Sequence, residues 1–214
     1  MSTPEKVVLD TTHFDSKARQ WDENPVFQER ARKIADALRA MVPLSTRMSA
    51  LDYGSGSGLL SFPLKDELGF ITLADTSAGM LDVVREKIAA QGVKNMAPLQ
   101  ADLSAAALPD TRFDLIYSSM ALHHIPDTDA ILESFHAHLN PGGWLAIADL
   151  DQEDGSFHGI EVDVHHGFDR EALAEKTRRA GFTHVAFRTV FEIEKDLPGG
   201  RRAYPVFLMV ARKW

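Results

Sequence analysis

Residues 51–58 read LDYGSGSG, and this stretch decides the fold that we expect. It begins inside a short apolar run, residues 48–53, which has the composition of a buried strand. The glycines that follow allow a tight backbone turn and a close approach of a ligand to the main chain. Residues 59–68 then have helical composition, although Pro63 suggests a helix that starts late or bends. The free N–H groups at the start of that helix are expected to face the turn.

Strand and helix patterns alternate from this turn to residue 150. Parallel strands need crossover connections, so this order predicts a parallel sheet with helices on both faces, and therefore an α/β fold. The predicted strands after the first lie at residues 70–74, 97–100, 113–118 and 144–150, and the predicted helices at 27–41, 78–90 and 129–139, with a turn at 140–143.

The end of the chain has a different pattern. A helix at residues 170–180, closed by Gly181, is followed by β-rich runs at 184–193 and 204–211 with no helix between them. Because only a loop containing Pro198, Gly199 and Gly200 joins these runs, they are expected to pair as an antiparallel hairpin at one edge of the sheet. The complete prediction is a Rossmann-like, mostly parallel sheet of seven strands.

Two aspartates accompany the glycine turn. Asp52 lies two residues before the first glycine, and Asp75 lies at the carboxyl end of the next predicted strand, where an acid accepts hydrogen bonds from ribose hydroxyls. A nicotinamide site usually reads Gly-x-Gly-x-x-Gly and holds a pyrophosphate. Here the third glycine comes one residue early, and Asp52 would repel a phosphate. The spacing favours a cationic, phosphate-free nucleoside.

Composition excludes several classes of function. The chain has 214 residues, a formal net charge of -8 and no cysteine. Thiolate metal sites, disulfides and cysteine nucleophiles are thereby excluded. The negative charge disfavours a nucleic-acid partner, because the basic runs at 176–179 and 200–202 are short. No run approaches the roughly 20 apolar residues of a membrane span, so we expect one cytoplasmic domain over residues 1–214.

The ordered motifs resemble class I S-adenosylmethionine-dependent methyltransferases. The matching stretches are ALDYGSGSGLL, LADTSAGMLDVVREK, LQADL, FDLIYSSMALHHIPD and LNPGGWLAIADL, which span residues 50–150. The chain is most similar to the small-molecule branch that includes the ubiquinone and menaquinone C-methyltransferases, whose members often begin with a phrase like FDSKARQWDENP. The resemblance implies S-adenosylmethionine as cofactor and S-adenosylhomocysteine as product. It also implies methyl transfer to a small-molecule acceptor.

The resemblance also implies a set of cofactor-binding residues. The methionine part would lie against Asp52 and the glycine turn, the ribose on Asp75, and the adenine near the residues after the second and third strands. The implied residues are Asp52, Gly54, Ser55, Gly56, Asp75, Thr76, Asp102, Leu103, and, on the sulfonium side, Ser118 and Ser119.

The methyl acceptor and its base are less defined. Methyl transfer needs mainly alignment, and a base helps only where the acceptor loses a proton. Two histidine pairs flank the carboxyl edge of the predicted sheet as candidate bases: His123 and His124, and His165 and His166. For the first pair, a structural or cofactor-side role is the alternative. A metal site could be imagined from a group of acidic residues and histidines: Asp149, Asp151, Glu153, Asp154, His158 and His165. We expect no metal, because acidic clusters of this kind are usually solvated.

The resemblance divides the domain into three parts. Residues 1–47 form an N-terminal helical segment or lid, 48–150 the cofactor core, and 151–214 a substrate-side loop, helix and hairpin. For Trp21, in this N-terminal segment, the alternative to a role in a lid over the cofactor is a structural role in packing. Competing functions are a cofactor-binding protein without catalysis and a nicotinamide-dependent oxidoreductase. A nucleic-acid amino methyltransferase is disfavoured, because residues 118–121 read SSMA in place of the Asn/Asp-Pro-Pro-aromatic segment.

Overall fold

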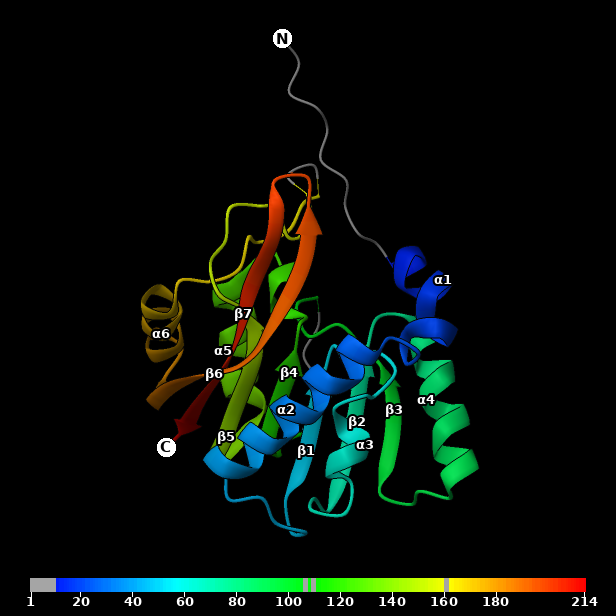
Figure 1. Cartoon of the computed structure of the whole chain (residues 1–214). Coiled ribbons are helices and arrows are strands. Elements are labelled where there is room, and N and C mark those ends of the chain that lie inside the picture. The colour runs from blue at the N-terminus through cyan, green and yellow to red at the C-terminus, as the bar shows by residue number, and fades with distance from the viewer. Residues whose placement is uncertain (1–10, 106–107, 109–110, 160–161) are drawn as a thin grey trace.

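The computed structural model describes residues 11–105, 108, 111–159 and 162–214, which form a twisted sheet with helices on both faces (Figure 1). Parts of the three predicted segments lie outside the described residues: 1–10 of the N-terminal segment, 106–107 and 109–110 of the core, and 160–161 of the C-terminal part. No helix among the described residues has the length and apolarity needed to cross a membrane.

The sheet has seven strands in the order β3-β2-β1-β4-β5-β7-β6. Strands β1 to β5 are parallel, whereas β7 is antiparallel to both β5 and β6. The predicted fold class and edge hairpin are therefore confirmed. The strands are β1 Ser49–Tyr53, β2 Phe70–Asp75, β3 Met96–Gln100, β4 Phe113–Ser119, β5 Leu139–Leu150, β6 Phe182–Leu197 and β7 Gly200–Lys213.

Strand β1 marks the point where the strand order reverses. It pairs with β2 on one side and β4 on the other, so that Asp52 lies beside Leu73 and Tyr117. Because the connections leave β1 and β4 in opposite directions, a crevice opens beyond their carboxyl ends. Open α/β sheets bind ligands in such crevices.

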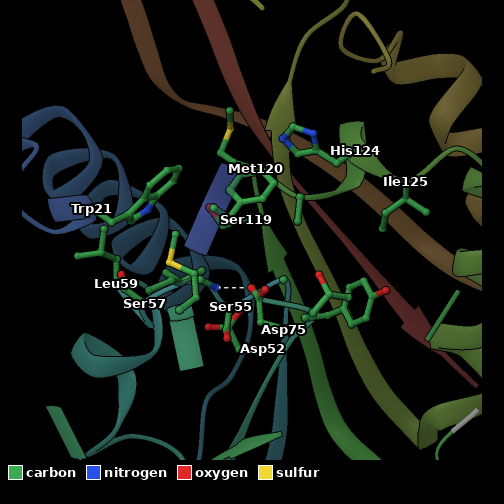
Figure 2. Close-up of a pocket in the computed structure, with 18 of the residues that line it drawn as sticks. Trp21, Asp52, Ser55, Ser57, Leu59, Asp75, Ser119, Met120, His124 and Ile125 are labelled. Atoms are coloured by element: carbon green, nitrogen blue, oxygen red, sulfur yellow. Dashed lines mark hydrogen bonds between the residues drawn. The ribbon is translucent and has the colours of Figure 1, made fainter. Parts of the chain in front are cut away.

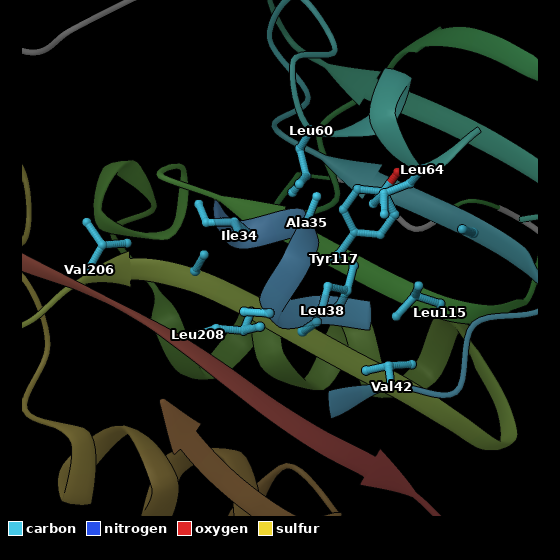
Figure 3. Packing of buried hydrophobic residues seen from close by; sticks show 14 of the residues in the cluster. Ile34, Ala35, Leu38, Val42, Leu60, Leu64, Leu115, Tyr117, Val206 and Leu208 are labelled. Atoms are coloured by element: carbon cyan, nitrogen blue, oxygen red, sulfur yellow. The ribbon is translucent and has the colours of Figure 1, made fainter. Parts of the chain in front are cut away.

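Helices cover the two faces of the sheet and bury separate apolar clusters. On one face α2 places Ile34 and Leu38 against Tyr117 and Leu208 (Figure 3). On the other face α5 and α6 cover Ile116 and the residues that alternate with the first set. The helices are α1 Thr11–Trp21, α2 Pro25–Met41, α3 Ser61–Leu64, α4 Ala78–Gln91, the 3-10 turn η1 Leu122–His124, α5 Thr128–His138 and α6 Arg170–Arg179.

Five elements differ from the prediction. The helix expected at residues 59–68 is confined to α3, where Pro63 donates no backbone hydrogen bond. Helix α1 lies in the N-terminal segment predicted as helical or a lid, but no helix was predicted at these particular residues, and its mean composition is polar. The predicted turn at 140–143 belongs to β5. Strands β6 and β7 extend well beyond their β-rich centres, because backbone pairing continues to Leu197 and Gly200 at the hairpin turn.

Candidate functional site

A cavity of about 510 Å³ lies beyond the carboxyl ends of β1, β2 and β4 (Figure 2). This volume is in the range of small-molecule and cofactor sites. Helices α1 and α2 close one side through Phe14, Trp21 and Phe27. Eight of the ten predicted cofactor-binding residues line it: Asp52, Gly54, Ser55, Gly56, Asp75, Thr76, Asp102 and Ser119.

The other two predicted residues do not line the cavity. Leu103 is 4% exposed and belongs to the apolar cluster beneath α5. Ser118 points its side chain into the protein interior, where its hydroxyl has no hydrogen-bond partner among the described residues. Successive strand residues face opposite sides of the sheet, so Ser118 and Ser119 at the end of β4 do not share an environment. The side chain of Ser119 is the one that borders the cavity.

The glycine turn is fixed to the end of β2. The amides of Gly54 and Ser55 both donate to the carbonyl of Ala74, at 2.8 and 3.0 Å. Gly54 and Gly56 have φ of 69° and 52°, in the left-handed region that glycine adopts without strain. A Cβ added to Gly54 would lie 2.5 Å from the Cβ of Ala121, so a side chain is excluded there on two grounds.

Asp52 is a buried carboxylate at the floor of the cavity. The Ser61 hydroxyl donates to its Oδ2 at 2.6 Å, and the Tyr117 hydroxyl lies 2.6 Å from that of Ser61. Burial raises the pKa of Asp52 to about 7. The hydrogen bond from Ser61 opposes this shift, and the negative charge on Asp75 adds to it. A positively charged group nearby would favour the ionised form.

Asp75 connects β2 to the glycine turn. Its Oδ2 accepts from the Gly56 amide at 2.7 Å, and its Oδ1 from the Ser77 amide at 2.8 Å. Burial raises the pKa of Asp75, and the backbone hydrogen bonds oppose that shift. Ser77, not Asp75, is the N-cap of α4, since its hydroxyl accepts from the Met80 amide at 3.1 Å. The role of Asp75 is therefore separate from helix capping.

Asp102 follows β3 at the opposite end of the cavity. Its Oδ1 accepts from the Tyr53 hydroxyl at 3.1 Å and from the Ser104 amide at 2.8 Å. Burial alone would raise the pKa of Asp102, but the hydrogen bonds from Ser104 and Tyr53 lower it. Asp102 is therefore an ionised acceptor held in a fixed orientation beside Thr76 and Ser104 on the cavity wall.

Of the four candidate bases, only His124 lines the cavity. His123 is 1% exposed and bonds through Nδ1 to Asp149 Oδ1 at 2.7 Å. Nε2 of His165 lies 2.9 Å from the carbonyl of Ile125. The buried Nε2 of His166 has no hydrogen-bond partner in the part of the chain that the structure describes. The geometry therefore places one of these four imidazoles where it could contact a bound molecule.

Arg30 is a cavity residue that was not predicted from the sequence. This residue of α2 is 9% exposed, and its guanidinium lies 4.9 Å from the centre of the Phe27 ring. Among the described residues it is the one Lys or Arg side chain on the cavity wall. Burial lowers the pKa of Arg30 to about 10, so the group stays charged at neutral pH. The signal that could have found Arg30 is its spacing, since it lies three residues after Phe27 and four before Ile34, on the apolar face of the helix, whereas the other arginines of α2 are exposed.

Helix α1 is held over the cavity by two aspartates. Asp15 accepts from the Gly79 amide at 2.9 Å and from the Ser77 hydroxyl, which attaches α1 to the start of α4. Asp22 accepts from Lys87 at 2.6 Å and also from the Ser57 hydroxyl. These contacts place a predicted lid segment directly against the glycine turn.

The fold and this site define the class I S-adenosylmethionine-dependent methyltransferases. A model of the methyltransferase domain family matches residues 26–189, and the chain belongs to this family. Its cofactor is therefore S-adenosylmethionine.

Known proteins agree with this assignment. An uncharacterised methyltransferase of Mycobacterium tuberculosis is 38% identical over 110 residues, covering 51% of this chain and 54% of that protein. A ubiquinone/menaquinone biosynthesis C-methyltransferase of a Shewanella species is 36% identical over 107 residues, covering 48% of this chain and 43% of that protein. The chain thus spans about half the length of the curated relatives it matches.

A solved structure has the same fold. An S-adenosylmethionine-dependent methyltransferase from Aquifex aeolicus superposes with a TM-score of 0.71 at 20% identity, covering 94% of this chain and 98% of that one. At this identity the likeness concerns the arrangement of helices and strands alone.

Proposed function

We propose that this protein transfers a methyl group from S-adenosylmethionine to a small-molecule acceptor in the cavity beyond β1 and β4. One observation carries the proposal: residues from four separate sequence motifs surround a single cavity of cofactor size. Two carboxylates lie at adjacent strand ends within it: Asp52, which is buried, and Asp75, which is half-buried.

The charges on the cavity wall fit the two ends of the cofactor. The methionine part carries an ammonium and a carboxylate, and we assign Asp52 to the ammonium and Arg30 to the carboxylate. Both groups are buried, and a buried charge is stable only when it is paired. Asp75 would accept from the ribose hydroxyls. Asp102 and Thr76 would contact the adenine, while Ser119 would line the sulfonium side.

The protein's contribution to the reaction would be alignment in a cavity that excludes water. When bound, S-adenosylmethionine supplies a methyl carbon activated by the sulfonium charge. The acceptor atom uses its electron pair to form the new bond to carbon, and the electrons of the broken C–S bond remain on sulfur. Alignment of this kind is worth about 7–11 kcal/mol. His124, on the wall beyond Ser119, would contact the acceptor.

A small molecule is the acceptor class that the surface and the relatives support. The net charge of -8 disfavours nucleic acid as acceptor. The Shewanella relative is named for biosynthesis of quinones, which are small molecules.

Calorimetry combined with an acceptor screen tests the proposal. S-adenosylmethionine and S-adenosylhomocysteine should bind and raise the melting temperature, because both bind the native state selectively. Release of S-adenosylhomocysteine should then identify acceptors among phenols, quinols and amines. Binding of NAD with no binding of either adenosyl ligand would contradict the assignment. Binding without turnover for any acceptor would favour a cofactor-binding protein.

A further inference from the structure

Three histidines converge beside the cavity. His123 and His124 lie on η1 after β4, and His158 lies in the loop between β5 and α6. Each offers one ring nitrogen, and these three nitrogens lie within 4.8 Å of one another. The rings are also close, with centroids 4.1 Å apart for His123 and His124 and 5.1 Å apart for His123 and His158.

A buried carboxylate fixes the orientation of His123. Nδ1 of His123 lies 2.7 Å from Oδ1 of Asp149, which is fully buried. An ionised carboxylate only accepts hydrogen bonds, so the proton of this contact is on Nδ1. In the neutral ring, the lone pair of Nε2 then points toward His158. Metal-binding histidines commonly have this arrangement, in which the second nitrogen donates to a carboxylate.

The distance between the ring nitrogens of His123 and His158 is close to that between two ligands of one metal ion. Nε2 of His123 and Nε2 of His158 are 3.1 Å apart. Two imidazole ligands at 2.0–2.1 Å from a tetrahedral ion would be about 3.3 Å apart. A shift of a few tenths of an ångström would accommodate the ion between these two rings, and a rotation of His124 would supply the third ligand.

We propose that His123, His124 and His158 bind a divalent transition metal, with Zn²⁺ preferred because all three ligands are imidazoles. Three protein ligands leave a fourth position for water or a bound molecule, as in open zinc sites. His124 borders the cavity, so this position lies on the acceptor side. The inference goes beyond the proposed function, since methyl transfer itself requires no metal.

This site differs from the acidic group considered in the sequence analysis. Asp151 forms an ion pair with Arg170 at 2.6 Å, and Asp154 forms one with Arg202 at 2.5 Å. These carboxylates are therefore held away from a shared ion. Two members of that group take part in the proposed site. His158 is a ligand, whereas Asp149 only accepts the hydrogen bond from the ligand His123.

Cobalt spectroscopy and zinc competition test the proposal on the untagged chain. Tetrahedral Co²⁺ should give intense visible absorption bands, and one equivalent of Zn²⁺ should remove them. The competing explanation of the cluster is an N–H···N hydrogen bond between His158 and His123. His158→Gln keeps an N–H donor for that bond and removes the ligand. It should lower Zn²⁺ affinity by more than about 100-fold.

Two further variants complete the test. Asp149→Asn should weaken Zn²⁺ binding by about 10- to 100-fold, as expected when a carboxylate behind a ligand is lost. His184→Gln removes an exposed imidazole outside the cluster and should leave the Zn²⁺ affinity unchanged. Absence of a stoichiometric Co²⁺ spectrum, or equal Zn²⁺ affinity in the wild type and His158→Gln, would overturn the site. Calorimetry with S-adenosylmethionine on the metal-free protein separates this failure from failure of the proposed function.

Discussion

The carboxylate of Asp75 accepts a hydrogen bond of 2.7 Å from the amide of Gly56, which joins the end of β2 to the turn after β1. Its other oxygen accepts from Ser77 at 2.8 Å. Each carboxylate oxygen has two lone pairs, so both keep one acceptor position beyond these backbone contacts. Asp75 also lines the cavity. The two backbone amides therefore fix an acceptor pair of the kind that a ribose diol requires.

Replacing Asp75 by Ala should weaken S-adenosylhomocysteine binding by a factor of tens or more. Hydrogen bonds to a charged group contribute about 1.5–3 kcal/mol each. Calorimetry on the variant with S-adenosylhomocysteine and with its 2′,3′-dideoxy analogue forms a double-mutant cycle. The loss should be much smaller for the analogue, which lacks the hydroxyls.

Asp114→Ala is the matched control for this change. Asp114 also accepts from a backbone amide, that of Ser49 at 2.9 Å, but at the opposite end of the sheet. This variant should lose stability without losing ligand affinity. An equal loss of affinity for both ligands in Asp75→Ala would instead show that Asp75 acts only by holding the turn.

Gly56→Ala should reduce cofactor binding selectively, and Gly92→Ala provides the comparison. The two glycines have φ of 52° and 64°, so alanine introduces similar strain, about 1–2 kcal/mol, at both. A Cβ on Gly92 would meet no described residue within 4 Å, whereas one on Gly56 would lie on the cavity wall, 3.9 Å from the Met80 sulfur. Thermal melts should show similar destabilisation. Calorimetry should show lost cofactor affinity for Gly56→Ala alone, and equal affinity in both variants would contradict the assigned position of the turn.

The motif residues could be predicted because their signals are local. In a parallel sheet, glycines before a helix indicate a turn that a ligand can approach, and acids at the ends of apolar runs indicate polar groups at the carboxyl edge where ligands bind. The position of His158 beside His123 could not be predicted, because it depends on contacts between segments that are distant in the sequence. Arg30 has the apolar spacing of its helix, but its place on the cavity wall depends on how α2 packs on the sheet. The bounds of helix α1 were not predicted, because its composition is polar and because Asp15 and the following Asp22 hold it by accepting hydrogen bonds from residues that are distant in the sequence. Which of Ser118 and Ser119 faces the cavity could not be predicted, because successive strand residues face opposite sides of the sheet and the exact end of β4 was not predicted.

Arg30→Met should weaken binding of S-adenosylmethionine and leave binding of its decarboxylated analogue nearly unchanged. Methionine retains much of the apolar contact with Phe27 and removes the charge. A charge-assisted hydrogen bond to the ligand carboxylate is worth about 1.5–3 kcal/mol, so the affinity should fall by roughly 10- to 150-fold. Arg32→Met, on the exposed side of the same helix, is the control. Equal losses for the two ligands would place Arg30 away from the carboxylate.

Asp15→Ala should loosen α1, whereas Asp15→Asn should not. Asparagine retains the oxygen that accepts from Gly79 and Ser77, and alanine removes it. Hydrogen exchange on residues 11–21 should become faster in Asp15→Ala, and cofactor should slow the exchange in the wild type if α1 closes over the ligand. Unchanged exchange in the presence of saturating cofactor would show that α1 is a fixed wall.

Asp52 should make cofactor binding depend on pH. Burial raises the pKa of Asp52 to about 7 from its usual 3.8. Below pH 7 the free protein therefore holds a proton that must leave before the carboxylate can pair with the ligand ammonium. The affinity should rise with pH by up to tenfold per unit below pH 7 and level off above it. Calorimetry at pH 6 in two buffers of different ionisation enthalpy should show release of close to one proton.

The same raised pKa affects stability in the opposite direction. The folded protein binds more protons than the unfolded chain between pH 3.8 and about 7, so the contribution of Asp52 to stability falls as pH rises through this window. Asp52→Asn keeps an oxygen to accept from Ser61 and carries no charge. At pH 8 this variant should melt at a higher temperature than the wild type and bind S-adenosylmethionine more weakly, with no proton release. A variant that binds as tightly as the wild type and still releases a proton would show that another group faces the ammonium.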